Sequence, residues 1–122
     1  MNRIKNLTPG AINVMIGTRT QIIIPSEGCA HVAEFVTPSA DLDLDVGQIP
    51  TCSTRYGSVE GLPPSDWVRG DGGWSGTYYI VSAMTALAVR ASGDYRDDLL
   101  CPGEIVRDAS GKVVGCRSLR RA

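Results

Sequence analysis

The sequence predicts an α+β fold, with a mostly antiparallel sheet, one main helix after a glycine-rich loop, and a C-terminal β-hairpin. Two observations support this. β-branched runs divided by Gly and Pro turns fill the first half, and one alanine-rich stretch at helical spacing follows Ser82. With 122 residues, the chain has the length of one domain, and we expect residues 1–122 to form it.

The first predicted elements are a hairpin and a single strand. Residues 11–16 and 21–24 are rich in isoleucine and valine and flank Gly17-Thr18-Arg19-Thr20, which is typical of a hairpin around a short turn. A third strand is predicted over residues 29–36. We expect it to end at Thr37-Pro38, because proline cannot donate to a central ladder.

The middle of the chain contains a strict alternation. Residues 41–46 alternate aspartate with an aliphatic residue, which places three carboxylates on one face of a strand. That face is either a solvated edge or a partner surface. Another strand is predicted over residues 49–56, with residues 57–62 pairing beside it until Pro63-Pro64 stops regular structure.

The second half mixes loop, strand and helix. Residues 66–76 form a glycine-rich stretch with both tryptophans, which suggests a flexible, ligand-facing loop. Residues 78–81 have strand propensity. Ser82 fits a helix N-cap, Arg90 suits the last turn, and Gly93 suits the left-handed residue after the helix.

The end of the chain predicts a second hairpin. Residues 104–108 and 112–119 flank Ala109-Ser110-Gly111, where Gly111 supplies the positive φ of a three-residue loop. The Arg120-Arg121 pair that follows fits a solvated, frayed end most simply, and the alternative is a tail that reaches the ligand of another subunit.

Composition excludes several classes of protein. A formal net charge of −1 disfavours nonspecific DNA coating, and the apolar runs are far too short to span a membrane. The first residues of the sequence lack the apolar core of a signal peptide, so we expect a cytosolic protein. Four cysteines without a CxxC pair and a single histidine, His31, predict reduced, mostly buried thiols, no metal and no cofactor.

Arginines and aromatic residues are the main candidates for ligand binding. Arg55, Arg107 and Arg117 lie in strand-like sequence, where a guanidinium can present a planar fork to phosphate or simply face water or pair with Asp108. The predicted helix start at Ser82 offers free backbone N–H groups, although such junctions are more often capped and wet. Further candidates beside these are Tyr78, Tyr79, Trp67 and Trp74, the last two of which could equally be structural anchors.

Catalysis has weaker support. The sequence contains no G-x-S-x-G elbow, and His31 in Ala30-His31-Val32 fits a strand residue with a satisfied side chain better than a general base. The carboxylates of Asp97-Asp98 and of residues 41–45 could form an acid/base pair or bind a cation, but such runs are usually solvated. We therefore expect a protein that is not an enzyme.

Several short segments form a pattern when taken together. They are Asn6-Leu7-Thr8-Pro9, Arg55-Tyr56-Gly57, Val59-Glu60-Gly61-Leu62-Pro63, Tyr79-Ile80-Val81-Ser82, Val106-Arg107-Asp108, Gly111 and Val114-Gly115-Cys116-Arg117-Ser118-Leu119. The pattern, most distinctive at its end, resembles small phage and prophage proteins of the first-described Thoeris anti-defence sponge family. Members of that family sequester cyclic ADP-ribose isomers made by bacterial immune enzymes.

The resemblance implies a phage-encoded binding protein that sequesters cyclic ADP-ribose isomers, and in some members cyclic oligonucleotides, without degrading them. It also implies a homo-oligomer in which dimers build hexamers. A chain this short would enclose such a ligand most readily between subunits. The candidate ligand-binding residues are Thr54, Arg55, Tyr78, Tyr79, Ser82, Arg107, Asp108 and Arg117.

Two alternatives remain open. One is a phage interaction protein that binds a host protein through the acidic residues 41–46 and the tryptophan loop. The other is an enzyme that cleaves the same kind of signal, for which His31 is the only histidine that could act as a base.

Overall fold

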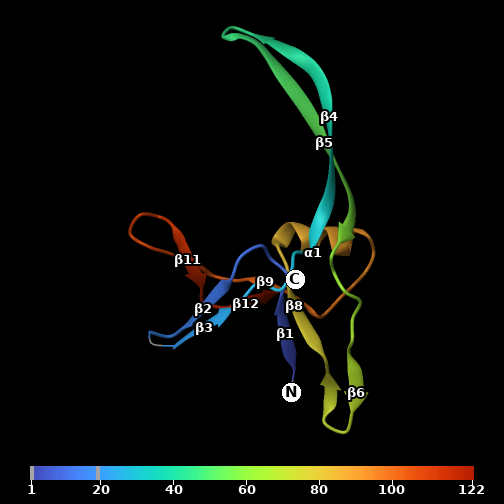
Figure 1. Ribbon diagram of the computed structural model, residues 1–122, viewed down its shortest axis with the longest axis vertical. Helices are drawn as coiled ribbons and strands as arrows, with labels where there is room; N and C mark the ends of the chain where they lie inside the picture. Colours follow the sequence, from blue (N-terminus) through green and yellow to red (C-terminus); the bar gives the residue numbers. More distant parts are fainter. Residues whose placement is uncertain (1, 19) are drawn as a thin grey trace.

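The computed structural model describes residues 2–18 and 20–122 and shows an α+β fold (Figure 1). Its centre is a four-stranded sheet, called here the central sheet, with the order β1-β8-β9-β12. β1 and β9 both run parallel to β8, whereas β12 runs antiparallel to β9. The strands are β1 (Arg3–Asn6), β8 (Thr77–Ile80), β9 (Leu99–Pro102) and β12 (Leu119–Arg121).

A second four-stranded sheet, the side sheet, has the order β10-β11-β2-β3. The predicted N-terminal hairpin is confirmed as β2 and β3, and the predicted C-terminal hairpin as β10 and β11, with Gly111 at φ 85°. The second strand of that C-terminal hairpin was predicted too long, because β11 ends at Cys116 and Leu119 belongs to the central sheet. Arg19 of the predicted N-terminal turn lies outside the described residues. The strands are β10 (Ile105–Arg107), β11 (Val113–Cys116), β2 (Ile12–Ile16) and β3 (Thr20–Ile24).

The core lies on both faces of the central sheet. Successive residues of a strand point to opposite faces, so Tyr79 and Ile80 of β8 enter different apolar clusters. Tyr79 packs with Val89 of helix α1 (Ala83–Ala91), and Ile80 packs with Val14 of the side sheet. The central sheet is therefore sandwiched between helix and side sheet, and it buries apolar residues on both faces.

Helix α1 (Ala83–Ala91) confirms the prediction made for it. The Ser82 side chain accepts a hydrogen bond from the Thr85 backbone N–H at 3.2 Å, and Gly93 has φ 87° just past the helix. The buried Thr85 hydroxyl also donates to the Ala30 carbonyl at 3.2 Å, which ties the helix to the segment before the next strand.

A long two-stranded ribbon, called here the arm, projects from this body at the top of Figure 1. It consists of β4 (His31–Leu44) and β5 (Gly47–Glu60), paired antiparallel. Two predictions were wrong here: β4 continues through Pro38, and residues 57–60 extend β5 instead of pairing beside it. Each strand of a two-stranded ribbon has an open edge, so a missing N–H at Pro38 can face water without loss of a ladder bond.

The glycine-rich segment is also structured. It forms β6 (Val68–Gly70) and β7 (Gly73–Ser75), a short hairpin called here the tryptophan hairpin, where a flexible loop was predicted.

Strands β1, β9 and β12 were not predicted, and Arg120-Arg121 is part of β12 instead of a frayed end. Within the described residues, no helix is long and apolar enough to cross a membrane.

The side chain of Asn6 joins the two sheets. It lies at the end of β1, fully buried, and its Nδ2 donates to the Gly10 carbonyl at 2.8 Å and to the Ile24 carbonyl of β3 at 3.0 Å. Its Oδ1 accepts from the Thr8 backbone N–H at 3.0 Å. One amide therefore fixes the turn after β1 and holds the end of the side sheet against the central sheet.

Replacing this amide should destabilise the whole fold. Asn6→Ala leaves buried carbonyl and N–H groups without partners, and we expect the free energy of unfolding to fall by about 2–3 kcal/mol. Urea denaturation followed by circular dichroism measures the change. The control is Asn13→Ala, which removes one 3.3 Å hydrogen bond to the Val114 carbonyl and should cost less than about 1 kcal/mol. Equal losses in the two variants would contradict the role given to Asn6.

Candidate ligand-binding site

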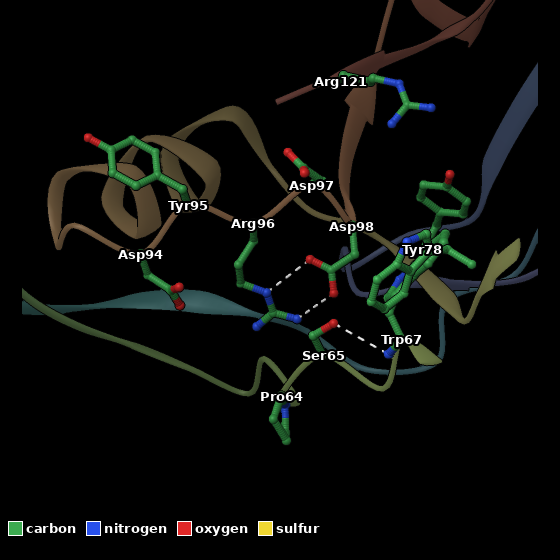
Figure 2. Close-up of a pocket in the computed structure, with 11 residues that line it drawn as sticks. Pro64, Ser65, Trp67, Tyr78, Asp94, Tyr95, Arg96, Asp97, Asp98 and Arg121 are labelled. Carbon is green, nitrogen blue, oxygen red and sulfur yellow. Dashed lines mark hydrogen bonds and ion pairs between the residues drawn. The ribbon is translucent and has the colours of Figure 1, made fainter. Parts of the chain in front are cut away.

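A pocket of about 640 Å³ lies at the tryptophan-hairpin end of the central sheet (Figure 2). This volume falls within the range of small-molecule sites. Its walls come from the tryptophan hairpin and the segment before it, from β8, from the segment between α1 and β9, and from β12. The lining residues are Pro64, Ser65, Trp67, Trp74, Tyr78, Asp94, Tyr95, Arg96, Asp97, Asp98 and Arg121.

Trp67 is the fixed part of the aromatic wall. Its indole Nε1 donates to the Thr77 carbonyl at 3.0 Å, and its ring meets Tyr78 edge to face with centroids 5.0 Å apart. Gly76 makes this contact possible, because a Cβ there would lie 2.8 Å from Trp67 Cγ. By contrast, Trp74 and Tyr95 are 62% and 82% exposed and have ring surface available to a ligand.

Asp66 fastens the tryptophan hairpin to β8. Its carboxylate accepts from the Thr77 backbone N–H at 2.8 Å and from the Thr77 hydroxyl at 2.7 Å. These hydrogen bonds, and to a smaller degree the charge of Arg3 at 3.7 Å, lower the pKa of Asp66 below its ordinary value. Trp67 is thus held in place by its own hydrogen bond to Thr77 and by the attachment of the preceding residue, Asp66, to the same strand.

A buried ion pair forms another wall (Figure 2). Arg96 donates from Nε and Nη2 to the two carboxylate oxygens of Asp98 at 2.9 and 2.7 Å, and from Nη1 to the Pro63 carbonyl at 2.9 Å. The two side chains are 10% and 4% exposed. Hydrogen bonding to Asp98 raises the pKa of Arg96, so this wall carries a paired charge that is already satisfied.

The remaining charged groups of the lining face solvent. The Arg121 guanidinium lies 5.8 Å from the centre of the Tyr78 ring, and Arg121 is the exposed last residue of β12. Asp94 and Asp97 are exposed, and among the described residues neither side chain has a hydrogen bond or ion pair. A cation, two carboxylates and several rings therefore converge on one cavity.

Of the eight candidate ligand-binding residues that follow from the resemblance, the structure brings only Tyr78 to this pocket. Tyr79 is buried in the core with Arg96 5.9 Å from its ring centre, and Ser82 caps helix α1. Thr54 and Arg55 lie on the arm, where Arg55 covers the ring of Phe35 at 5.6 Å.

The other three predicted residues lie on the β10–β11 hairpin. Arg107 Nη1 donates to the Gly111 carbonyl at 2.9 Å across its own turn. Asp108 accepts from the Ser110 backbone N–H at 2.9 Å and from the Lys112 backbone N–H at 3.0 Å, so it organises that turn. Arg117 is exposed just after β11. Ligand binding by these residues stays a prediction, and the hairpin does not line the pocket.

Sequence reasoning missed Arg96, and it considered Arg121 only as part of a frayed end or of a tail to another subunit's ligand. The signal for Arg96 was its spacing from Asp98, because side chains two apart on an extended segment can pair. Nothing local distinguished Arg121 from a solvated end, since its position depends on β12 joining β9. The tryptophans were considered as stacking residues, and both line the pocket.

The histidine and cysteines lie elsewhere. His31 is on the arm, with Nε2 3.2 Å from the Glu60 carboxylate. Cys101 and Cys116 are buried as expected, whereas Cys29 and Cys52 are exposed, so the prediction of mostly buried thiols was half wrong. Among residues 2–18 and 20–122, no group of three or more His, Cys, Asp or Glu side chains could hold a metal ion.

Comparison of the chain with models of protein families, with curated proteins and with solved structures found no match.

The buried ion pair gives a stability prediction. Arg96→Met leaves Asp98 buried without a partner, and we expect the free energy of unfolding to fall by about 3–5 kcal/mol. The double variant Arg96→Met/Asp98→Leu removes the stranded charge and should recover more than half of that loss. Chemical denaturation of the three proteins tests this, and a double variant no more stable than Arg96→Met would refute it.

The pKa of Asp66 gives a pH prediction. Its pKa is lower in the folded protein than in the unfolded chain, so the unfolded chain binds more protons and stability rises with pH. The contribution of Asp66 is complete above the unfolded pKa of about 4 and is lost as pH falls through the folded value.

Melting temperatures of the wild type and of Asp66→Asn should therefore converge as pH falls from 7 to 3. Asp71→Asn, at the exposed turn of the same hairpin, is the matched control and should follow the wild type throughout. A constant difference between wild type and Asp66→Asn across this range would be inconsistent with the assigned pKa.

Proposed function

We propose that this pocket binds a nucleotide-like ligand and holds it without chemical change. The observation that carries the proposal is the cluster of Trp67, Trp74 and Tyr78 beside the Arg121 guanidinium in one cavity. Aromatic faces suit a planar base, and an arginine suits the phosphate attached to it.

The carboxylates refine the ligand class. Asp94 and Asp97 accept hydrogen bonds and donate none when ionised, so they suit the hydroxyls of a ribose or the exocyclic amine of adenine. They would repel a ligand that carries only negative charge. A nucleoside with a phosphate provides base, sugar and anion together, which matches the three kinds of lining group.

Within this class, we propose a cyclic ADP-ribose isomer as the ligand and sequestration of a bacterial immune signal as the role. Support comes from the resemblance of the sequence to phage anti-defence sponges and from the fit of an adenine, two riboses and a diphosphate to rings, carboxylates and an arginine. Binding is favoured over cleavage because Asp98, one member of the acid/base pair considered above, is held in its ion pair with Arg96. In addition, the lining residues include no histidine or cysteine, and His31 lies on the arm.

Tryptophan fluorescence is a direct test, since both tryptophans of the chain line the pocket. We expect titration with cyclic ADP-ribose isomers to change the emission, and titration with cyclic dinucleotides tests the wider class. Loss of one stacking partner costs about 1–3 kcal/mol, so Trp74→Ala should weaken binding about 5- to 150-fold.

Arg121→Gln should weaken binding about tenfold or more, because it removes a charge-assisted contact to phosphate. Arg120→Gln is the matched control, since neighbouring residues of β12 point to opposite faces of the sheet. Calorimetric titration of both variants against the same nucleotide measures the two dissociation constants, which should differ clearly.

Chromatography of the ligand recovered after denaturation separates sequestration from catalysis. An intact ligand agrees with the proposal, whereas an altered one would show an enzyme. Unchanged emission and no heat with any nucleotide would reject the site and would favour a protein partner.

A further inference from the structure

We propose that Arg69 of the tryptophan hairpin is a second phosphate-binding cation of the pocket. Together, Arg69 and Arg121 select a ligand with two linked phosphates over a ligand with one. The inference rests on the function proposed above, since it assumes that the pocket holds a nucleotide. Three observations carry it: the charge of the lining, the strand pairing of the tryptophan hairpin, and the exposure of the Arg69 side chain.

The lining alone has the wrong charge for a diphosphate. It contains two arginines and three aspartates, a formal charge of −1. Arg96 is neutralised by Asp98. Among the described lining residues, this leaves Arg121 as the one cation that can meet an anion, together with the exposed Asp94 and Asp97. Each phosphate of a diphosphate carries negative charge, so the pocket needs a further cation to hold both.

Strand pairing places Arg69 on the pocket face of the tryptophan hairpin. Arg69 of β6 is paired directly with Trp74 of β7. Directly paired residues lie on the same face of an antiparallel ribbon, with Cβ atoms about 4.5–5.5 Å apart. Trp74 lines the pocket. Trp67 also lines it and lies two positions before Arg69, which agrees with strand alternation. Val68 and Ser75 form the neighbouring pair and belong to the other face.

The Arg69 side chain is available to a ligand. It is exposed, and among the described residues its guanidinium makes no hydrogen bond or ion pair. The hairpin that carries it is fixed to β8, because the side chains of Asp66 and Trp67 both form hydrogen bonds with Thr77. Arg69 therefore presents an unpaired planar fork, the group that matches phosphate oxygens, from a strand whose place is set.

The two cations lie at the two ends of one aromatic wall. The Arg121 guanidinium is 5.8 Å from the centre of the Tyr78 ring, and Tyr78 meets Trp67 edge to face. Figure 2 shows these three side chains on one side of the pocket. Beyond Trp67 follows the hairpin face that carries Arg69. A base that stacks on this wall has one arginine from β12 and one from the hairpin available to its phosphates.

Three other arginines near the pocket are less suitable. Arg90 lines a separate cavity of about 70 Å³ beside it, in the last turn of helix α1. Arg3 lies 3.7 Å from the Asp66 carboxylate, which already takes up its charge. Arg120 precedes Arg121 in β12 and so belongs to the opposite face of the central sheet.

Calorimetric titration with ADP and AMP tests the inference, because the two nucleotides share base and ribose and differ by one phosphate. The wild type should bind ADP more tightly than AMP. Arg69→Gln should weaken binding of ADP and of cyclic ADP-ribose isomers about tenfold or more. Its dissociation constant for AMP should stay within about threefold of the wild type, because Arg121 still meets a single phosphate. Arg69→Lys keeps the charge without the fork and should retain part of the preference for ADP.

Arg90→Gln is the matched control, because it removes the same charge from a residue that does not line the pocket. It should leave both dissociation constants within about threefold. Equal wild-type affinity for ADP and AMP, or equal weakening by Arg69→Gln and Arg90→Gln, would overturn the inference while nucleotide binding itself stands. So would Arg69→Gln that binds ADP at wild-type strength. A wild type that binds no nucleotide at all would reject the proposed function, and the role of Arg69 with it, before any variant is compared.

Discussion

The buried amide of Asn6 is the contact on which the arrangement of the two sheets depends. Side chains from β8, β9 and β11 fill the space between the sheets, but apolar contacts have no direction and would tolerate a sliding of one sheet over the other. Hydrogen bonds from Asn6 to Gly10 and Ile24 set the position of the side sheet. In addition, the Glu27 N–H donates to the Asn6 carbonyl and the Leu7 N–H to Ile80, so the chain crosses between layers at this point.

Local signals predicted the elements that local chemistry determines. Ser82 and Gly93 bracket a helix because an N-cap and a left-handed residue act within one turn, and Gly111 specifies its hairpin in the same way. Strands β1, β9 and β12 have no such signal. They are three or four residues long and owe their structure to pairing with β8 or with each other, across up to about seventy residues of chain. Non-local pairing of this kind is not encoded in any short window.

The same distinction explains which part of the candidate site was predictable. The aromatic residues could be recognised by type, because rings in a glycine-rich segment are unusual enough to invite a role in binding. The two arginines of the pocket could not be recognised in this way. Arg96 is placed by the path of the segment after α1, and Arg121 by the pairing of β12 with β9. The arginines that did stand out, Arg55 and Arg107, bind their own neighbours on the arm and on a turn.

The position of Arg121 has a consequence for the order in which the protein matures. Arg121 is paired with Leu100 in the last strand of the central sheet, and it also contributes its guanidinium to the pocket. Helix α1 and the tryptophan hairpin precede residues 119–121 in the chain, so the corner of the pocket at Arg121 is the last part to be synthesised. Under the function proposed above, capture of an anionic ligand is therefore restricted to molecules whose central sheet is complete, and a nascent or C-terminally clipped chain would not hold the ligand.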